Sequence, residues 1–214
     1  MSKPFSENEL YSQLASDRTW RVKELSDLKS AIKEADGPRQ RVLLRALVAI
    51  AYAHWEGHVR LASEKYLTHV ALRKLPLSAL TRQFTRNAFL PQIKAAASHG
   101  FDERGELVDR ILGAGELRFA RVNADLISTR SNLNFSVFAD ICLICGIQPE
   151  LFREEETFID TILLKRRNSI AHGEETFVGI EELDSLSDRI VALMRRFGDE
   201  LANLAALGRY RAES

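Results

Sequence analysis

The chain has 214 residues, enough to bury a substantial core, and its 5 prolines and 11 glycines are typical of a globular protein rather than a disordered or fibrous one. Its 30 basic and 30 acidic residues cancel, which argues against a protein that coats nucleic acid through overall positive charge. Two cysteines and an N-terminal stretch without an apolar signal-peptide core predict a cytoplasmic protein. The most apolar stretch, 42–59, contains Arg45, His54 and Glu56, so no membrane span is expected.

The first two predicted helices are long. Helical spacing of apolar residues covers about 8–35, and the "DGP" at 36–38 supplies a stop and a new start. The next helix, about 38–75, is apolar on most sides between 42 and 62, which is typical of a helix in the middle of a bundle.

A basic segment follows, so the charges of this neutral chain are unevenly distributed along the sequence. Between residues 65 and 101 there is no Asp or Glu, so its six cations give +6 and the remainder of the chain carries −6. The six are Lys65, Arg73, Lys74, Arg82, Arg86 and Lys94. A solvated helix face and a landing site for a polyanion both fit this pattern.

The rest of the chain also shows helical periodicity. Shorter helices around 77–97, broken at Pro91, and a glycine-rich connection predict a helical insertion of roughly 76–130. Further helices are expected at 132–146, at 149–171, and at 180–207 with a continuous apolar stripe. We therefore predict a single all-α domain over 1–214, a bundle of about four long antiparallel helices with the insertion between the second and the third.

The segment "LLKRRNSIAHGEE", 163–175, ends a predicted helix with an unusual group of polar residues. Asn168 and His172 are four apart and share a face, and Arg167 sits one position round, while Gly173 suits the C′ position. A guanidinium can hold a phosphate and an imidazole can transfer a proton, which together suit RNA cleavage by the 2′-hydroxyl without a metal. Spacing alone favours the simpler role of cations complementing a helix dipole.

The surrounding sequence adds a family resemblance. "RRNSIAHGE", 166–174, is similar to the Arg-Asn-x-x-x-His signature of the HEPN superfamily. The stretches "YAHWEGHVR", "SNLNFSVFADICLICGI" and "VGIEELDSLSDRI" resemble the stand-alone prokaryotic branch often labelled MAE-type, so the likeness covers roughly 40–205. The fold that this resemblance implies is a HEPN-like helical bundle.

The resemblance also implies an activity. A protein of this kind would be a metal-independent endoribonuclease that leaves 2′,3′-cyclic phosphate ends and needs no cofactor. It would act as a toxin or an anti-phage defence effector. Arg167 and His172 would be the catalytic pair and Asn168 their positioning partner, in a composite site shared by a homodimer. An antitoxin or another defence protein would be a partner. Two alternatives remain: a non-catalytic HEPN module that binds RNA or protein, and a purely structural bundle whose motif is a helix cap.

Several other polar residues could contribute to this site or have structural roles instead. Glu56, in the apolar second helix, is expected either to hydrogen-bond Arg167 or His172 or to have a structural or solvent-facing role. Candidate contacts to the RNA backbone are Lys165, Arg166, Arg82, Arg86 and Lys94. His54 and His58 lack a third ligand, and Cys142 and Cys145 lack a second pair, so no metal site is predicted and structural roles are expected.

Overall fold

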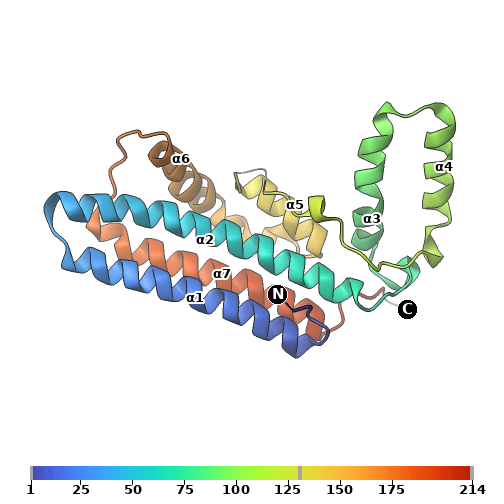
Figure 1. Cartoon of the computed structure of the whole chain (residues 1–214), viewed down its shortest axis with the longest axis horizontal. Coiled ribbons are helices and arrows are strands. Elements are labelled where there is room, and N and C mark those ends of the chain that lie inside the picture. The colour runs from blue at the N-terminus through green and yellow to red at the C-terminus, as the bar shows by residue number, and fades with distance from the viewer. Residues whose placement is uncertain (1, 130–131, 213–214) are drawn as a thin grey trace.

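Three long helices form the main bundle of the computed structural model, which describes residues 2–129 and 132–212. They are α1 (Glu7–Glu34), α2 (Gly37–Ala71) and α7 (Leu183–Ala206), and they run side by side along the long axis of the molecule (Figure 1). The shorter helices α5 (Phe135–Cys145) and α6 (Arg166–Ala171) pack against α2 (Figure 1). The described residues form only isolated β-bridges and no strand, so the all-α prediction is confirmed.

Local sequence signals set the ends of the first two helices. Ser6 caps α1 in a reciprocal box, because its hydroxyl accepts from the Glu9 N–H at 3.2 Å and the Glu9 carboxylate accepts from the Ser6 N–H at 2.8 Å. Gly37 takes a positive φ of 48° and Pro38 follows it in the first turn of α2, so the chain reverses over two residues.

The helix α2 occupies the middle of the bundle, as its all-round apolar pattern predicted. Its fully buried Trp55 packs edge-on against Phe138 of α5 and Phe197 of α7, with ring centroids 5.0 and 6.3 Å apart. Burying a large apolar side chain of this kind stabilises the fold by roughly 1.5–3 kcal/mol. No described helix is long and apolar enough to cross a bilayer.

Between α2 and α5 the chain forms a helical hairpin of α3 (Arg82–Ala95) and α4 (Phe101–Leu112), which projects from one end of the bundle (Figure 1). The predicted break at Pro91 is wrong, because α3 continues through this residue. A proline inside a helix removes one hydrogen bond and crowds the preceding turn, and here the helix tolerates that cost without ending. The side chain of Asn87 helps to hold α3 in place, since its Nδ2 donates to the Ile144 carbonyl at 2.8 Å.

The fourth long helical segment, 149–171, was predicted as one helix but has three successive geometries. A 3₁₀ helix (Pro149–Glu155) is followed by a π-helical stretch (Phe158–Lys165) and then by the α-helical turns of α6. The expectation of one regular helix is therefore wrong in detail. The π-helical stretch widens each turn, and it ends directly before Arg166, where the polar motif begins.

Candidate active site

The end of α6 exposes the imidazole of His172. Gly173 has φ +78°, a conformation that favours glycine, and its N–H donates to the Ile170 carbonyl at 3.1 Å. The Glu174 N–H donates to the Ser169 carbonyl at 2.9 Å, which completes a Schellman cap. The exposed imidazole makes no hydrogen bond with the described part of the chain, so no neighbour there occupies its ring nitrogens.

Arg167 is held by three neighbours. Its Nη1 donates to Asn168 Oδ1 at 2.7 Å, and its guanidinium carbon lies 4.5 Å from the centroid of the Tyr52 ring. Its Nη2 is 4.0 Å from Glu56 Oε2, a charge contact rather than a hydrogen bond. The side chain nevertheless remains 29% exposed, so the guanidinium is both oriented and accessible to an anion.

Tyr52 belongs to this arrangement although the sequence analysis did not single it out. Its buried hydroxyl accepts a hydrogen bond from the Leu133 N–H at 2.6 Å, which fixes the ring beneath Arg167. Burial, followed by the negative charge of Glu56, raises the pKa of Tyr52 to about 12, so the phenol stays neutral. The available signal was its position four residues before Glu56, on the same face of α2.

Two arginines hold the loop that follows the motif. Arg45 Nη2, from α2, donates to the Glu174 carbonyl at 3.0 Å. Arg166 Nη1 donates to Glu182 Oε2 at 2.6 Å, and the other oxygen of that carboxylate accepts from the Gly179 N–H at 3.2 Å. Arg166, a candidate RNA contact, is therefore already occupied by a half-buried ion pair that fixes the loop.

The remaining candidate RNA contacts lie in two places. Lys165 is exposed immediately before α6. Arg82, Arg86 and Lys94 are exposed on α3, at the opposite end of the bundle from α6 (Figure 1). Within one chain the structure does not bring the α3 cations to the motif.

The two histidines of α2 take part in a buried network with α1 and α7. His58 Nδ1 lies 2.8 Å from Asp17 Oδ2, and its Nε2 lies 2.9 Å from the Met194 carbonyl. Arg21 donates to both oxygens of Asp17 at 2.9 Å, and its Nη1 lies 3.4 Å from His54 Nδ1. Within the described ranges, no three His, Cys, Asp or Glu side chains are grouped as a metal site. Structural roles for both histidines agree with these contacts.

The two cysteines are free thiols in the core. Cys142 and Cys145 are both fully buried on α5, and burial raises the pKa of each thiol well above its usual range. Neither thiol is therefore suited to act as a nucleophile.

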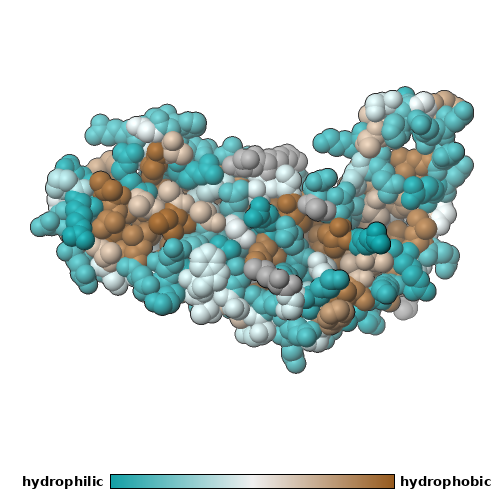
Figure 2. All heavy atoms as spheres, in the orientation of Figure 1, coloured by the Kyte–Doolittle hydropathy of each residue, from teal (hydrophilic) through white to brown (hydrophobic). Residues whose placement is uncertain are grey.

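An exposed apolar surface flanks the motif. Phe177, in the loop after α6, is 76% exposed, and Val42, at the start of α2, is 66% exposed. Ile180, three residues after Phe177, is also exposed. Figure 2 shows hydrophobic side chains gathered over the N-terminal half of α2, next to α6.

Comparison with known proteins gives a family match over most of the chain. A family model described as RiboL-PSP-HEPN matches residues 16–203, a range that contains α2, α6 and every candidate residue described above. Searches of curated proteins and of solved structures found no match.

Proposed function

Because the chain belongs to the RiboL-PSP-HEPN family of the HEPN superfamily, whose domains are generally ribonucleases or RNA-binding modules, we propose that it is an endoribonuclease. The observation that carries this proposal is the pairing of two groups on α6. The imidazole of His172 is exposed and unpaired within the described residues, and the guanidinium of Arg167 is held in place while still reaching solvent. Asn168 orients Arg167 through its amide oxygen.

The chemistry of these groups suits transesterification within the RNA. The 2′-oxygen attacks the phosphorus, the bond from phosphorus to the 5′-oxygen breaks, and the products are a 2′,3′-cyclic phosphate and a 5′-hydroxyl. A base must take the proton from the 2′-hydroxyl, and an acid must protonate the leaving 5′-oxygen. His172 supplies an imidazole for proton transfer, and Arg167 stabilises the negative charge that grows on the phosphoryl oxygens.

One motif contains one histidine, whereas the reaction needs two proton transfers. A homodimer that places two copies of His172 across one RNA strand would supply both. The exposed apolar side chains of Val42, Phe177 and Ile180 support such an arrangement, because exposed apolar residues gathered beside a site are suited to a protein interface. A composite site between two copies therefore belongs to the proposal, as does a role as a toxin or defence effector controlled by a partner protein.

A second function, a non-catalytic module that binds RNA or protein, is favoured by one contact. The Glu56 carboxylate lies 4.0 Å from Arg167 Nη2, so part of the charge of Arg167 is neutralised before any phosphate arrives. A site built only for binding could retain this arrangement, and the two functions differ in whether His172 is needed for strand cleavage.

The test uses purified wild-type protein and the variants His172→Ala and Arg167→Ala, each incubated with total RNA in the presence of EDTA, followed by mapping of new ends. We expect cyclic-phosphate ends with wild type and a loss of at least about 100-fold in each variant. His99→Ala, which changes an exposed histidine between α3 and α4, is the matched control and should keep full activity. Cleavage that persists in His172→Ala would contradict the mechanism. RNA binding without cleavage by folded wild type would favour the binding module.

A further inference from the structure

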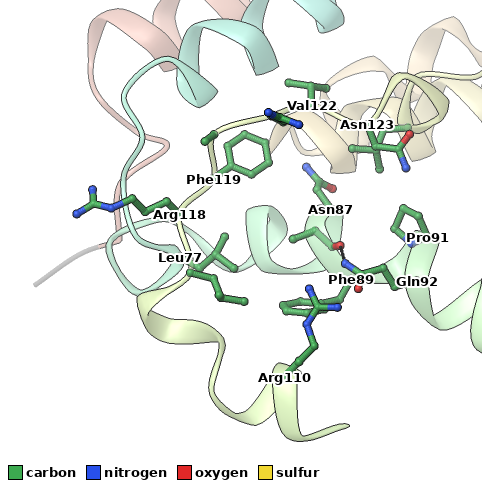
Figure 3. Close-up of a pocket in the computed structure, with 15 residues that line it drawn as sticks. Leu77, Asn87, Phe89, Pro91, Gln92, Arg110, Arg118, Phe119, Val122 and Asn123 are labelled. Carbon is green, nitrogen blue, oxygen red and sulfur yellow. Dashed lines mark hydrogen bonds between the residues drawn. The ribbon is translucent and has the colours of Figure 1, made fainter. Parts of the chain in front are cut away.

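A cavity of about 500 Å³ lies at the base of the α3–α4 hairpin, far from the motif along the bundle (Figures 1 and 3). It is formed by α3, by the last turn of α4 and by the segment 117–126, which ends in a short 3₁₀ helix (Ala124–Leu126). Apolar side chains that line it include Leu77, Phe89 and Phe119 (Figure 3). Its size is that of a small-molecule site.

The walls of the cavity are tied together by backbone hydrogen bonds. The Leu77 N–H donates to the Leu117 carbonyl at 2.8 Å, and the Phe119 N–H donates to the Leu75 carbonyl at 3.0 Å. Phe119 also packs edge-on against Phe84 of α3, with ring centroids 5.1 Å apart. These contacts make the cavity a preformed feature of the fold.

The charge of the lining is entirely positive. Arg110, Arg118 and Arg121 line the cavity, and no Asp or Glu does. Arg110 and Arg121 make no hydrogen bond or ion pair with any described residue, and Arg118 donates to the Lys74 carbonyl at 2.8 Å. Arginines on the bundle are commonly paired, as Arg166 is with Glu182. Unpaired guanidinium groups around an apolar hollow are suited to a ligand that is both anionic and flat.

We propose that this cavity binds one unpaired nucleotide of an RNA strand, with the base in the apolar hollow and its phosphate on Arg110 and Arg121. The amide groups of Asn87, Gln92 and Asn123 also line the cavity, and each makes one hydrogen bond within the protein, to the Ile144 carbonyl, the Ala88 carbonyl and the Asp125 N–H respectively. Their remaining donors and acceptors can hydrogen-bond the edge of a base. A base inside a duplex is stacked and paired, so only single-stranded RNA can place one there. This inference rests on the proposed function and deepens it by naming the class of RNA.

The distance between the motif and the cavity defines the path that a bound RNA strand would follow along the molecule. Glu56, beside Arg167, and Ala71, at the end of α2, are 15 residues apart, so the helix separates them by about 22 Å. Arg60 is exposed one turn after Glu56 on the same face of α2, and it makes no bond with another described residue. The single strand would therefore extend from the motif past Arg60 to the cavity.

The experiment measures binding without cleavage. A 5′-fluorescein single-stranded RNA oligonucleotide is titrated with His172→Ala protein, and Kd is followed by fluorescence anisotropy at several salt concentrations. In that background we expect Arg121→Glu to raise Kd about tenfold or more and to reduce the salt slope by about one. The control is Arg195→Glu, an equal charge change at an exposed position of α7, which should alter Kd less than twofold.

Two further measurements separate the cavity from general charge attraction. Ala88→Leu fills part of the cavity without changing charge and should also weaken binding, and a duplex of the same length should bind more weakly than the single strand. Equal effects of Arg121→Glu and Arg195→Glu, unchanged binding by Ala88→Leu, or equal affinity for the duplex would each overturn the proposal. Since all these proteins lack His172, the outcome is independent of whether the wild type cuts RNA. Circular dichroism and Tm confirm that each variant is folded.

Discussion

Replacing Asp17 by asparagine removes the carboxylate that hydrogen-bonds the buried side chains of Arg21 and His58. Burial alone would raise the pKa of Asp17, but the hydrogen bonds and charges of His58 and Arg21 hold it at about 2 instead of 3.8. This difference corresponds to about 2 kcal/mol of folding free energy at neutral pH. The variant also leaves Arg21 and His58 buried without their anion, which typically costs about 3–5 kcal/mol. We therefore expect Asp17→Asn to lose roughly 3 kcal/mol of stability at pH 7.

Urea unfolding at pH 7 and at pH 3 tests both the size and the sign of this effect. Because folding lowers the pKa of Asp17, its contribution is complete above pH 3.8 and disappears as the pH falls through about 2. At pH 3 about half of the contribution of Asp17 is lost. The difference in free energy of unfolding between wild type and Asp17→Asn should therefore be smaller at pH 3 than at pH 7 by about 1 kcal/mol. The control is Asp199→Asn, whose half-exposed ion pair with Arg18 should contribute less than about 1 kcal/mol. The reasoning would be refuted if Asp17→Asn lost less unfolding free energy than Asp199→Asn, or if its loss did not depend on pH.

Three further predictions concern α2 and the surface beside the motif. Tyr52→Leu removes the ring beneath Arg167 and should lower the RNA cleavage rate about tenfold. Tyr52→Phe keeps the ring and should retain most activity, but it leaves the Leu133 N–H without its acceptor and should lose about 1–3 kcal/mol of stability in urea. Gly57→Ala should destabilise the protein in the same assay despite the better helix propensity of alanine. The new β-carbon would lie 2.8 Å from Nη1 of Arg21, and this buried side chain cannot move aside without weakening its two hydrogen bonds to Asp17. A gain in stability would contradict this. Phe177→Glu should convert the proposed dimer to monomer in sedimentation velocity, and an unchanged mass would remove this surface from the interface.

The long helices could be predicted from the sequence because their signals are local. Apolar spacing and the "DGP" corner gave α1 and α2 to within a few residues, and the apolar stripe gave α7. The continuity of α3 through Pro91 and the π-helical stretch before Arg166 were not predicted. Those features depend on how each segment packs against its neighbours, which spacing along the chain does not specify.

The candidate site shows the same limit. Arg167, Asn168 and His172 fall within two helical turns, so the sequence alone groups them, and their catalytic role stays a prediction. The HEPN superfamily is confirmed, by a match described as RiboL-PSP-HEPN, whereas the flanking motifs had suggested the MAE-type branch. The contribution of Tyr52 was not predicted: its spacing of four residues from Glu56 is a local signal, but using it requires knowing which face of α2 packs against α6.

One short stretch of α2 serves both the core and the candidate site. Tyr52 and Glu56 are four residues apart and face Arg167, whereas His54 and His58, also four apart, face Arg21 and Asp17 on α1. Among the residues that the structure describes, no hydrogen bond links the side chains of the two faces, so a change at Asp17 should reach Arg167 by moving α2. At a temperature where Asp17→Asn is still folded, the cleavage rate per folded molecule should therefore match that of wild type. Tyr52→Leu should instead lower the cleavage rate per folded molecule, because it removes the ring that orients Arg167, the proposed phosphate contact.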